Sequence, residues 1–381
     1  MKLSAIPWTG LPIYVVCFDD CPHHSSSSFS LTHIAFPSLL QPDVPHLPAS
    51  SASATTMSTP AQISIFPASS ASASRLAQLL QDRHPDIRVR LAARSPAKLQ
   101  ASGSNVSIAQ SSLNVSDPAS IKDALDGSDA AYIMNPPFYT EQDPAALSKT
   151  FIDNIVAAAN ASSTLKRIVF LSSIGAEKTS GTGPINNVHI AETGLLADLR
   201  DGVEAIALRP PYFLSNFKSV LPLAISPPHI LPSMLLPFDK PYALIDSSAI
   251  AEKALKYLVA PPSSAADAAG KNHITVAQLV TAPKTIPEIA QIVAEITGTP
   301  VTAVPVPEDQ WLPTFQKAGM PDKLASAFYD LTKATNTGYV GYLDQPQIDA
   351  EAQRGVTVIT EHTDVDTKAA LERLIEQVKS A

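Results

Sequence analysis

The sequence predicts an α/β protein with a doubly wound parallel sheet, and three features of the chain support that prediction. Short apolar runs alternate with segments of helical periodicity over residues 62–260, which is typical of successive βαβ units. Two of the runs, 167–171 and 205–208, lead into polar residues, as strands do at the ligand-binding edge of such a sheet. With 381 residues, of which 45% are hydrophobic, the chain can bury one large domain or a domain and a second lobe.

The expected strands and helices follow one another in a regular order. Short apolar runs are expected to form strands at residues 63–66, 88–93, 130–134, 167–171 and 205–208. Leu76 and Leu80 have the spacing of an apolar helix face after the first strand. Asp117 before Pro118 is typical of a helix start, because aspartate caps the first turn and proline fits there, so we predict a helix over 118–125. Helical spacing of apolar residues predicts another helix over 147–159.

The C-terminal part of the chain is expected to add a smaller α+β lobe. Asp246 is expected to cap a helix, and Gly298 to end a helix over 286–297. The remaining elements expected there are a strand over 301–306 and helices over 311–319, 321–333 and 371–378. The proline-rich segment 221–241 is too long for an ordinary connection, so we assign it to a lid or to the lobe. We predict a main domain over 61–260 and a smaller substrate or lid lobe from 210–245 and 270–381.

The first 57 residues are expected to lie outside the folded domain. Residues 22–59 are crowded with Ser, Pro and His and bury too little apolar surface to offset the entropy of ordering. Residues 3–18 are apolar, but they contain Pro7 and Pro12, lack a small-residue cleavage site and are too short to span a bilayer. Met57 offers an alternative start, so residues 1–57 are either disordered or a product of gene prediction.

Composition excludes several classes of partner. The net charge of −8 gives no basic field that would attract nucleic acid or an anionic membrane. The two cysteines, Cys17 and Cys21, offer no disulfide framework, which favours a reducing, cytoplasmic environment. These cysteines and the neighbouring His23 and His24 suggest zinc ligands, but acidic residues separate them and no second ligand cluster follows. We therefore expect no metal site.

The turn after the first expected strand has lost the glycines of a dinucleotide-binding loop. That loop has the pattern Gly-x-x-Gly-x-x-Gly and presents backbone amides to a pyrophosphate at the start of a helix. Pro67, Ser70 and Ala73 occupy the three glycine positions, and proline lacks an amide donor. Two interpretations stay open. Either Ser69, Ser70 and Ser72 still bind the pyrophosphate of the cofactor, or the segment is only a strand-to-helix turn.

The residues after the second expected strand indicate which cofactor the site would take. An acidic residue there would bind the ribose hydroxyls of NAD, whereas this chain has Arg94 and Lys98. Cations at this place suit the 2′-phosphate of NADP, and the planar guanidinium can meet a phosphate with two hydrogen bonds. The alternative is a solvated pair of surface charges. We expect NADP(H).

Several further motifs occur in the order found in one known family. They are residues 135–137 (NPP), 171–176 (LSSIGA), 180–184 (SGTGP), 189–192 (HIAE) and 208–216 (LRPPYFLSN). Over roughly residues 61–380 the chain resembles the NmrA-like branch of the atypical short-chain dehydrogenase/reductase superfamily, common in fungi and bacteria. The resemblance implies a Rossmann-like NAD(P)-binding domain with a smaller C-terminal α+β substrate lobe. Members include NAD(P)H-dependent reductases, quinone and secondary-metabolite oxidoreductases, and non-catalytic redox-sensing regulators.

The resemblance leaves the catalytic group open. Typical members of the superfamily use a Tyr-x-x-x-Lys pair, and no such pair occurs within residues 173–209. Tyr329 and Lys333 have this spacing in the expected lobe, where we interpret it as coincidence. His189 and Glu192, three residues apart, would share one face of a helix. His189 could act as a general acid, position the nicotinamide, or only pack at the helix start.

Polar and aromatic residues after neighbouring strands complete the expected site. No Ser-His-acid arrangement accompanies the serines at 172 and 173, so we expect them to contact the cofactor rather than to act as nucleophiles. Cofactor contacts on the nicotinamide side are expected from Asn135, Pro136, Ser172, Ser173 and Asn216. The side chains expected to enclose a planar substrate or the nicotinamide ring are Tyr139, Tyr212 and Phe213. Alternatively, these aromatic residues only cover a loop hinge.

The sequence therefore favours a cytoplasmic NAD(P)H-dependent oxidoreductase that reduces a small carbonyl, quinone or secondary-metabolite substrate. The alternative is a non-catalytic regulator or scaffold that senses NADP(H), or binds nothing, and acts through a protein partner. The missing glycines and the missing Tyr-x-x-x-Lys pair both keep that alternative open.

Overall fold

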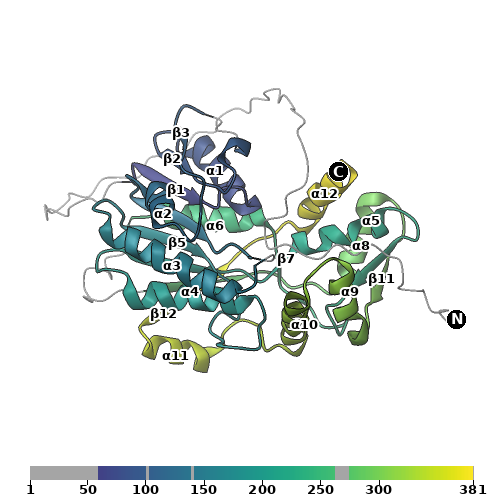
Figure 1. Cartoon of the computed structure of the whole chain (residues 1–381). Helices are drawn as coiled ribbons and strands as arrows, with labels where there is room; N and C mark the ends of the chain where they lie inside the picture. Colours follow the sequence, from purple (N-terminus) through teal and green to yellow (C-terminus); the bar gives the residue numbers. More distant parts are fainter. Residues whose placement is uncertain (1–58, 100–102, 139–140, 262–273, 381) are drawn as a thin grey trace, which may run out of the picture.

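The structure of the chain is a computed structural model that describes residues 59–99, 103–138, 141–261 and 274–380 (Figure 1). The predicted extension over residues 1–57 and the candidate residue Tyr139 lie outside these ranges. Within them, no helix combines the length and the apolar character needed to cross a membrane.

An eight-stranded sheet forms the middle layer, and all of its strands pair in parallel. The strand order across the sheet is β12-β10-β6-β5-β4-β1-β2-β3. Its first strands along the chain are β1 (Gln62–Phe66), β2 (Arg88–Leu91), β3 (Val106–Ile108), β4 (Ala130–Met134), β5 (Arg167–Leu171) and β6 (Glu204–Arg209). Every strand predicted before residue 209 is present. The order reverses between β1 and β4, which confirms the predicted doubly wound, Rossmann-like α/β fold.

Helices cover both faces of the sheet (Figure 1). On one face, α1 (Ala71–Arg83) and α6 (Ser247–Val259) share an apolar cluster with the strands, which includes Leu76 and Leu80 as predicted. On the other face lie α2 (Pro118–Leu125), α3 (Pro144–Ala161) and α4 (Ile185–Asp198), which share a second cluster. The predicted helix start is confirmed. The Asp117 side chain accepts a hydrogen bond from the Ala119 amide, and proline stands in the first turn.

Two strands of the sheet come from the segment that the sequence analysis assigned to the lobe. They are β10 (Ile274–Val280) and β12 (Val356–His362), which extend the sheet beyond β6. The short helix α11 (Gln345–Gln353) precedes β12 and packs beside it. The main sheet therefore draws on residues from both sides of the lobe segment.

The second lobe lies on the right in Figure 1 and has apolar clusters of its own. Its strands are β7 (Tyr212–Phe213), β8 (Ile230–Ser233), β9 (Leu244–Ile245) and β11 (Thr302–Pro305), which pair as β7-β9 and β8-β11. Its helices are η2 (Leu214–Ser219), α5 (Leu221–Ile225), α8 (Ile286–Thr297), η3 (Glu308–Gln310), α9 (Trp311–Lys317) and α10 (Asp322–Thr337). The final helix, α12 (Thr367–Lys379), also packs into this lobe. The predicted ends at Asp246 and Gly298 are confirmed as caps of α6 and α8.

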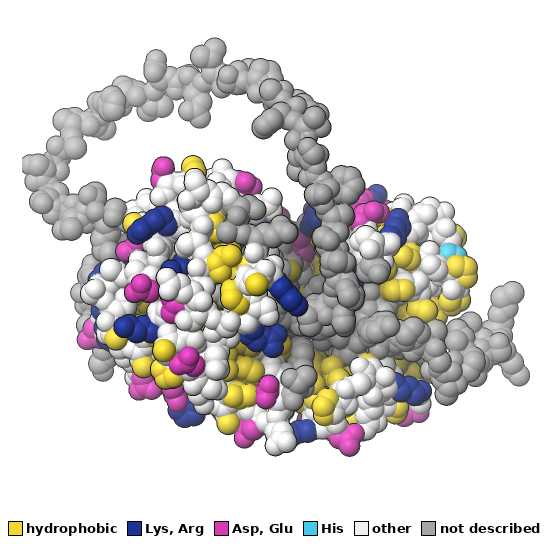
Figure 2. Space-filling view, turned by 45° about the horizontal axis from the view of Figure 1, so that its top comes forward, with side chains coloured by type: hydrophobic (Ala, Val, Ile, Leu, Met, Phe, Trp, Pro, Cys, Tyr) yellow, Lys and Arg dark blue, Asp and Glu magenta, His cyan; other side chains and the backbone are white. Residues whose placement is uncertain are grey.

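The described part of the face in Figure 2 carries positive and negative side chains interspersed with one another. The described residues contain no group of three or more His, Cys, Asp or Glu side chains placed to hold a metal ion.

Candidate functional site

Two adjoining cavities lie where β4 and β5 end, at the sheet edge where parallel α/β folds bind ligands. The smaller has a volume of about 40 Å³ and the larger about 140 Å³. Ser173 and Phe213 line both, so the cavities meet at these residues. The predicted residues that line the smaller cavity are Asn135, Pro136, Ser172, Ser173 and Phe213. Those that line the larger are Ser173, Tyr212, Phe213 and Asn216. Residues predicted from separate motifs are thus brought together at this edge.

Asn135 presents an unpaired acceptor beside the smaller cavity. It follows β4, and its amide nitrogen donates a hydrogen bond to Ser148 Oγ at 2.9 Å. Its carbonyl oxygen is buried and has no partner. A buried acceptor without a partner costs free energy that a ligand can recover by donating a hydrogen bond. The carboxamide of a nicotinamide ring carries such a donor, so this oxygen fits the expected cofactor.

Ser172 is held in place by a buried ion-pair network. Its hydroxyl donates a hydrogen bond to Glu192 Oε1. Glu192 also accepts two hydrogen bonds from Arg209, one from Nη2 at 2.6 Å and one from Nε at 3.1 Å. The third guanidinium nitrogen, Nη1, donates a hydrogen bond to Glu177 at 3.1 Å. Burial would lower the pKa of Arg209, but the carboxylates of Glu192, Glu177 and Glu351 outweigh burial and raise that pKa. The network ties the ends of β5 and β6 to α4.

His189 does not face either cavity. Its Nδ1 lies 2.8 Å from the carbonyl oxygen of Ala176, in the loop after β5, and its side chain is half-buried. Its neighbours Asn187 and Val188 line the smaller cavity instead. The sequence analysis missed Asn187, because the motif marks a helix but not the rotation that decides which residues of the first turn reach the site. The predicted catalytic role of His189 stays a prediction.

Two of the serines predicted to bind pyrophosphate turn their hydroxyls into the protein. Ser70 Oγ caps α1 by accepting a hydrogen bond from the Ala73 amide at 3.2 Å, and Ser72 Oγ lies 3.0 Å from Tyr132 Oη. Both serines are fully buried, whereas Ser69 is exposed. The first turn of α1 carries no acidic side chain. What this loop offers a phosphate is therefore Ser69 and the start of α1, which attracts anions through its amides and dipole.

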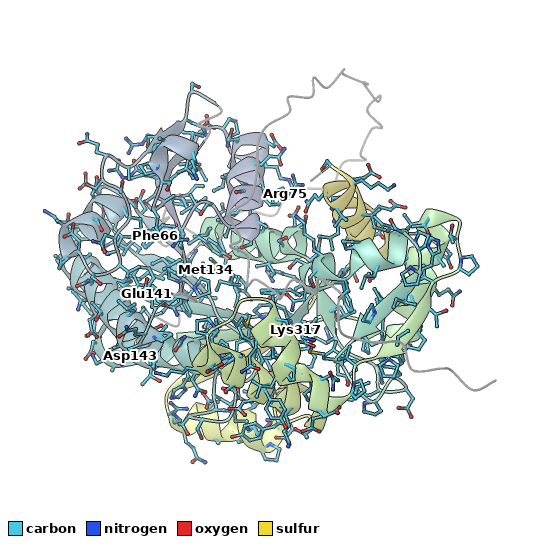
Figure 3. All side chains as sticks on the ribbon, turned by 45° about the vertical axis from the view of Figure 1, so that its right-hand side comes forward. Phe66, Arg75, Met134, Glu141, Asp143 and Lys317 are labelled. Carbon is cyan, nitrogen blue, oxygen red and sulfur yellow. The ribbon has the colours of Figure 1, made fainter. Side chains whose placement is uncertain are left out.

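The predicted phosphate-binding cations are exposed and available. Arg94 follows β2, and Lys98 ends the short helix η1 (Pro96–Lys98). Within the described ranges neither side chain has an ion-pair partner within 4.0 Å. Figure 3 shows the neighbouring part of the edge: Phe66 and Met134 end β1 and β4, and Arg75 lies on α1.

Tyr212 and Asn216 are the polar pair of the larger cavity. Burial raises the pKa of Tyr212 to about 12, although a hydrogen bond from the Asn216 side chain opposes the rise. The Phe217 ring packs edge-on against the Tyr212 ring at 6.1 Å between centroids. Among the described residues that line the two cavities, Tyr212 alone has a titratable side chain. Its phenol is therefore the one titratable group that the described lining offers to a compound in these cavities.

The loop after β5 lies directly against helix α10 of the lobe. A Cβ atom added at Gly183 would lie 2.0 Å from the carbonyl oxygen of Ala327, so no other residue fits there without moving the helix. A Cβ atom added at Gly175 would meet the Val340 side chain at 3.0 Å, a tight contact but a less severe one. These glycines allow the lobe to close over the sheet edge. They explain the glycine-rich motif at 180–184, which the sequence analysis had used only as a family feature.

Comparison with solved structures shows the same fold in several oxidoreductases. The NADPH-dependent quinone oxidoreductase of Escherichia coli, complexed with NADPH, has a TM-score of 0.59 and 19% identity over 84% of this chain and 99% of its own. The triphenylmethane reductase of Citrobacter sp. has a TM-score of 0.59 and 17% identity over 84% of this chain and 100% of its own. At these identities the likeness shows the fold alone.

A regulator shares the fold as well. NmrA, a negative transcriptional regulator, has a TM-score of 0.55 and 13% identity over 85% of this chain and 92% of its own. A comparison with curated proteins finds no match by sequence. Residues 68–204, which run from the turn after β1 to the start of β6, match the model of the NAD(P)H-binding family.

Proposed function

We propose that this protein is an NADP(H)-dependent oxidoreductase that reduces a small carbonyl, quinone or secondary-metabolite compound in the cytoplasm. The observation that carries the proposal is the pair of cavities at the sheet edge. The smaller is lined by asparagine and serine side chains at the ends of β4 and β5, and the larger is mainly apolar. A nicotinamide ring in the first would lie beside an apolar substrate in the second.

The residues present fit the cofactor. Arg94 and Lys98 would hold the 2′-phosphate, and Ser69 with the start of α1 would hold the pyrophosphate. Asn135 Oδ1 would accept a hydrogen bond from the nicotinamide carboxamide, because that oxygen otherwise stays buried without a partner. Ser172, fixed by Glu192, would pack against the ring from the end of β5.

The proposed reduction needs a hydride donor and a proton donor beside the substrate. NADPH, when bound, supplies a hydride to an electrophilic carbon of the substrate. The phenol of Tyr212 would donate a proton to the oxygen that becomes basic, and a pKa of about 12 keeps the phenol protonated at physiological pH. His189 is the alternative proton donor, but a change in the loop at Ala176 would have to release it first.

A second candidate function is a regulator that senses NADP(H) and acts through a protein partner. It is favoured by the fold shared with NmrA and by the lack of a Tyr-x-x-x-Lys pair on α4. Such a regulator would bind NADPH at the same edge without turning over any compound in the larger cavity.

Nucleotide binding tests the cofactor site. We expect fluorescence titration of the full chain to show tighter binding of NADPH than of NADH, and Arg94→Ala to weaken NADPH about tenfold. Arg88→Ala is the matched control, because this exposed arginine lies at the opposite end of β2 and should leave both affinities unchanged. Binding of neither nucleotide at millimolar concentration would overturn the oxidoreductase proposal.

Single-turnover kinetics test the proton donor. We expect Tyr212→Phe to slow the reduction of a ketone about 100-fold while leaving NADPH affinity unchanged, because only the proton transfer is removed. His189→Gln should change the rate by no more than a few fold. If His189→Gln slowed the reduction and Tyr212→Phe did not, the histidine and not the tyrosine would be the proton donor.

A further inference from the structure

Among the described residues that line the larger cavity, Asn216 alone has a buried side-chain oxygen or nitrogen atom without a hydrogen-bond partner. Asn216 lines the cavity, and its carbonyl oxygen is buried without a partner. Around it the wall is formed mainly by hydrocarbon, including the side chains of Phe217, Val306, Phe315 and Leu331. A neutral acceptor in such surroundings loses its hydration and gains nothing in return until a donor reaches it.

The orientation of this amide is explained by its neighbour. Because Asn216 Oδ1 has no hydrogen-bond partner, the amide nitrogen is the group of this side chain that donates to the Tyr212 phenol. The carbonyl oxygen must then point away from the phenol oxygen. The pair therefore presents one donor, the phenol hydroxyl, and one acceptor, the amide oxygen.

We propose that the compound bound in the larger cavity carries a neutral hydroxyl group in addition to the carbonyl that is reduced, and that Asn216 Oδ1 accepts the hydrogen bond of this hydroxyl. The proposal rests on the function proposed above and names its substrate class: a hydroxylated aromatic ketone or quinone. The carbonyl oxygen meets the phenol of Tyr212, and the hydroxyl meets Asn216.

The lining of the cavity favours a neutral aromatic compound over a charged one. Apart from the phenol, no titratable side chain lines the described wall, so an ammonium or carboxylate group would be desolvated without a counter-charge. The rings of Phe315 and Phe328, whose centroids are 5.8 Å apart, form an aromatic side of the cavity. A flat ring with one hydroxyl matches the apolar wall and supplies the donor that Asn216 Oδ1 lacks.

Binding of matched ketones tests the proposal. The probes are 4′-hydroxyacetophenone, 3′-hydroxyacetophenone, acetophenone and 4′-methoxyacetophenone, titrated calorimetrically into the full chain with and without NADP⁺. We expect at least one hydroxylated ketone to bind about tenfold more tightly than acetophenone and the methoxy compound, since only the hydroxyl donates to Asn216. In Asn216→Leu the preference should disappear, because the acceptor is removed.

Three results would overturn the proposal: equal affinity for the hydroxylated and unsubstituted ketones, an unchanged preference in Asn216→Leu, or no binding of any ketone at millimolar concentration. The comparison among ketones in the unmodified protein decides the matter even where a variant folds poorly. NADP⁺ cannot donate a hydride, so the titration does not depend on turnover. A hydroxyl preference without any reductase activity would refute the proposed function, and only the hydrogen bond between the ligand hydroxyl and Asn216 Oδ1 would remain.

Discussion

At the scale of single residues, Arg209 joins the end of β6 to α4 and to the loop after β5. Only 2% of this side chain is exposed, so its charge depends on the carboxylates around it, of which Glu177 and Glu192 form ion pairs with it and Glu351 interacts from farther away. Glu192 also receives the Ser172 hydroxyl, which links the arginine to the end of β5. A buried pair of this kind adds little net stability, but removing one member leaves a charge that is poorly compensated.

This predicts a large effect of a small substitution. We expect Glu192→Gln to lower the free energy of unfolding by about 3 kcal/mol, because Arg209 then loses the carboxylate that accepts two of its hydrogen bonds and keeps only the weaker interactions with Glu177 and Glu351. Urea denaturation followed by circular dichroism measures the change. Asp153→Asn is the matched control: its ion pair with Lys149 is exposed, so the loss should be about 0.5 kcal/mol. Equal losses in the two variants would contradict a structural role for the buried network.

At the scale of elements, the contact between the loop after β5 and α10 decides how closely the lobe approaches the sheet. Gly181 and Gly183 both have positive φ angles, of 76° and 56°, so alanine is strained at either position. They differ in their surroundings. A Cβ at Gly181 would make ordinary contact with the Tyr339 ring at 3.5 Å, whereas at Gly183 it would collide with the backbone of α10.

The two glycines therefore form a matched pair of substitutions. We expect Gly183→Ala to lower the free energy of unfolding by about 2 kcal/mol more than Gly181→Ala, because only the first forces α10 to move. Gly183→Ala should also weaken ligand binding in the larger cavity, which α10 helps to line. Urea denaturation and calorimetry measure the two effects. Indistinguishable variants would show that the close approach is not required.

One carboxylate on the last strand of the sheet, β12, joins this strand to helix α6 by hydrogen bonds and ion pairs. Glu361 on β12 accepts hydrogen bonds from Lys253, Lys256 and Tyr257 of α6, at 2.6 to 3.1 Å. Burial alone would raise the pKa of Glu361, but these contacts outweigh it and hold the pKa at about 2. A carboxyl whose pKa is lowered by folding adds stability above its unfolded pKa, and that stability is lost as the pH falls toward its folded pKa.

We therefore expect Glu361→Gln to lower the free energy of unfolding by about 1–2 kcal/mol at neutral pH. The difference from the unmodified protein should shrink as the pH falls from about 4.5 toward about 2, because the glutamate gains a proton there and the glutamine does not. Urea denaturation across that window measures it. Glu376→Gln, at an exposed ion pair, should show almost no difference at any pH.

The helices and strands that could be predicted from sequence are those whose ends depend on neighbouring residues in the chain. Asp117 and Gly298 mark helix ends because capping depends on a few neighbouring residues. The short strand β3 was missed, since its three residues form a strand only by pairing with β2. The site was harder still. The burial of Ser72 and the pairing of Glu192 with Arg209 depend on residues far away in the chain, which no local pattern reveals.

At the scale of the whole molecule, the chain passes between the sheet and the lobe several times. Strands β10 and β12 both belong to the sheet, yet the residues between them build α8, β11, α9 and α10 of the lobe. After β12 the chain returns to the lobe, where Leu371 and Ile375 of α12 pack in the same cluster as Ile289 of α8. Neither part is a continuous segment: the chain enters the lobe after β10 and again after β12, so unfolding the lobe removes the elements that follow both strands.

The sheet and the lobe should therefore unfold together. Trp311 reports on the lobe: it is buried, and its indole nitrogen donates to the Val306 carbonyl at 2.8 Å. Trp8 is the other tryptophan, so Trp8→Phe makes fluorescence specific for the lobe. We expect the urea transition from that fluorescence to coincide with the transition from far-ultraviolet circular dichroism, which reports on all helices and strands. A lobe held only by surface contacts would lose its fluorescence signal at lower urea, and a saturating nucleotide would then stabilise the sheet but not the lobe. If instead the two parts share one transition, NADP⁺ should shift both signals by the same amount, because the ligand stabilises the folded molecule as a unit.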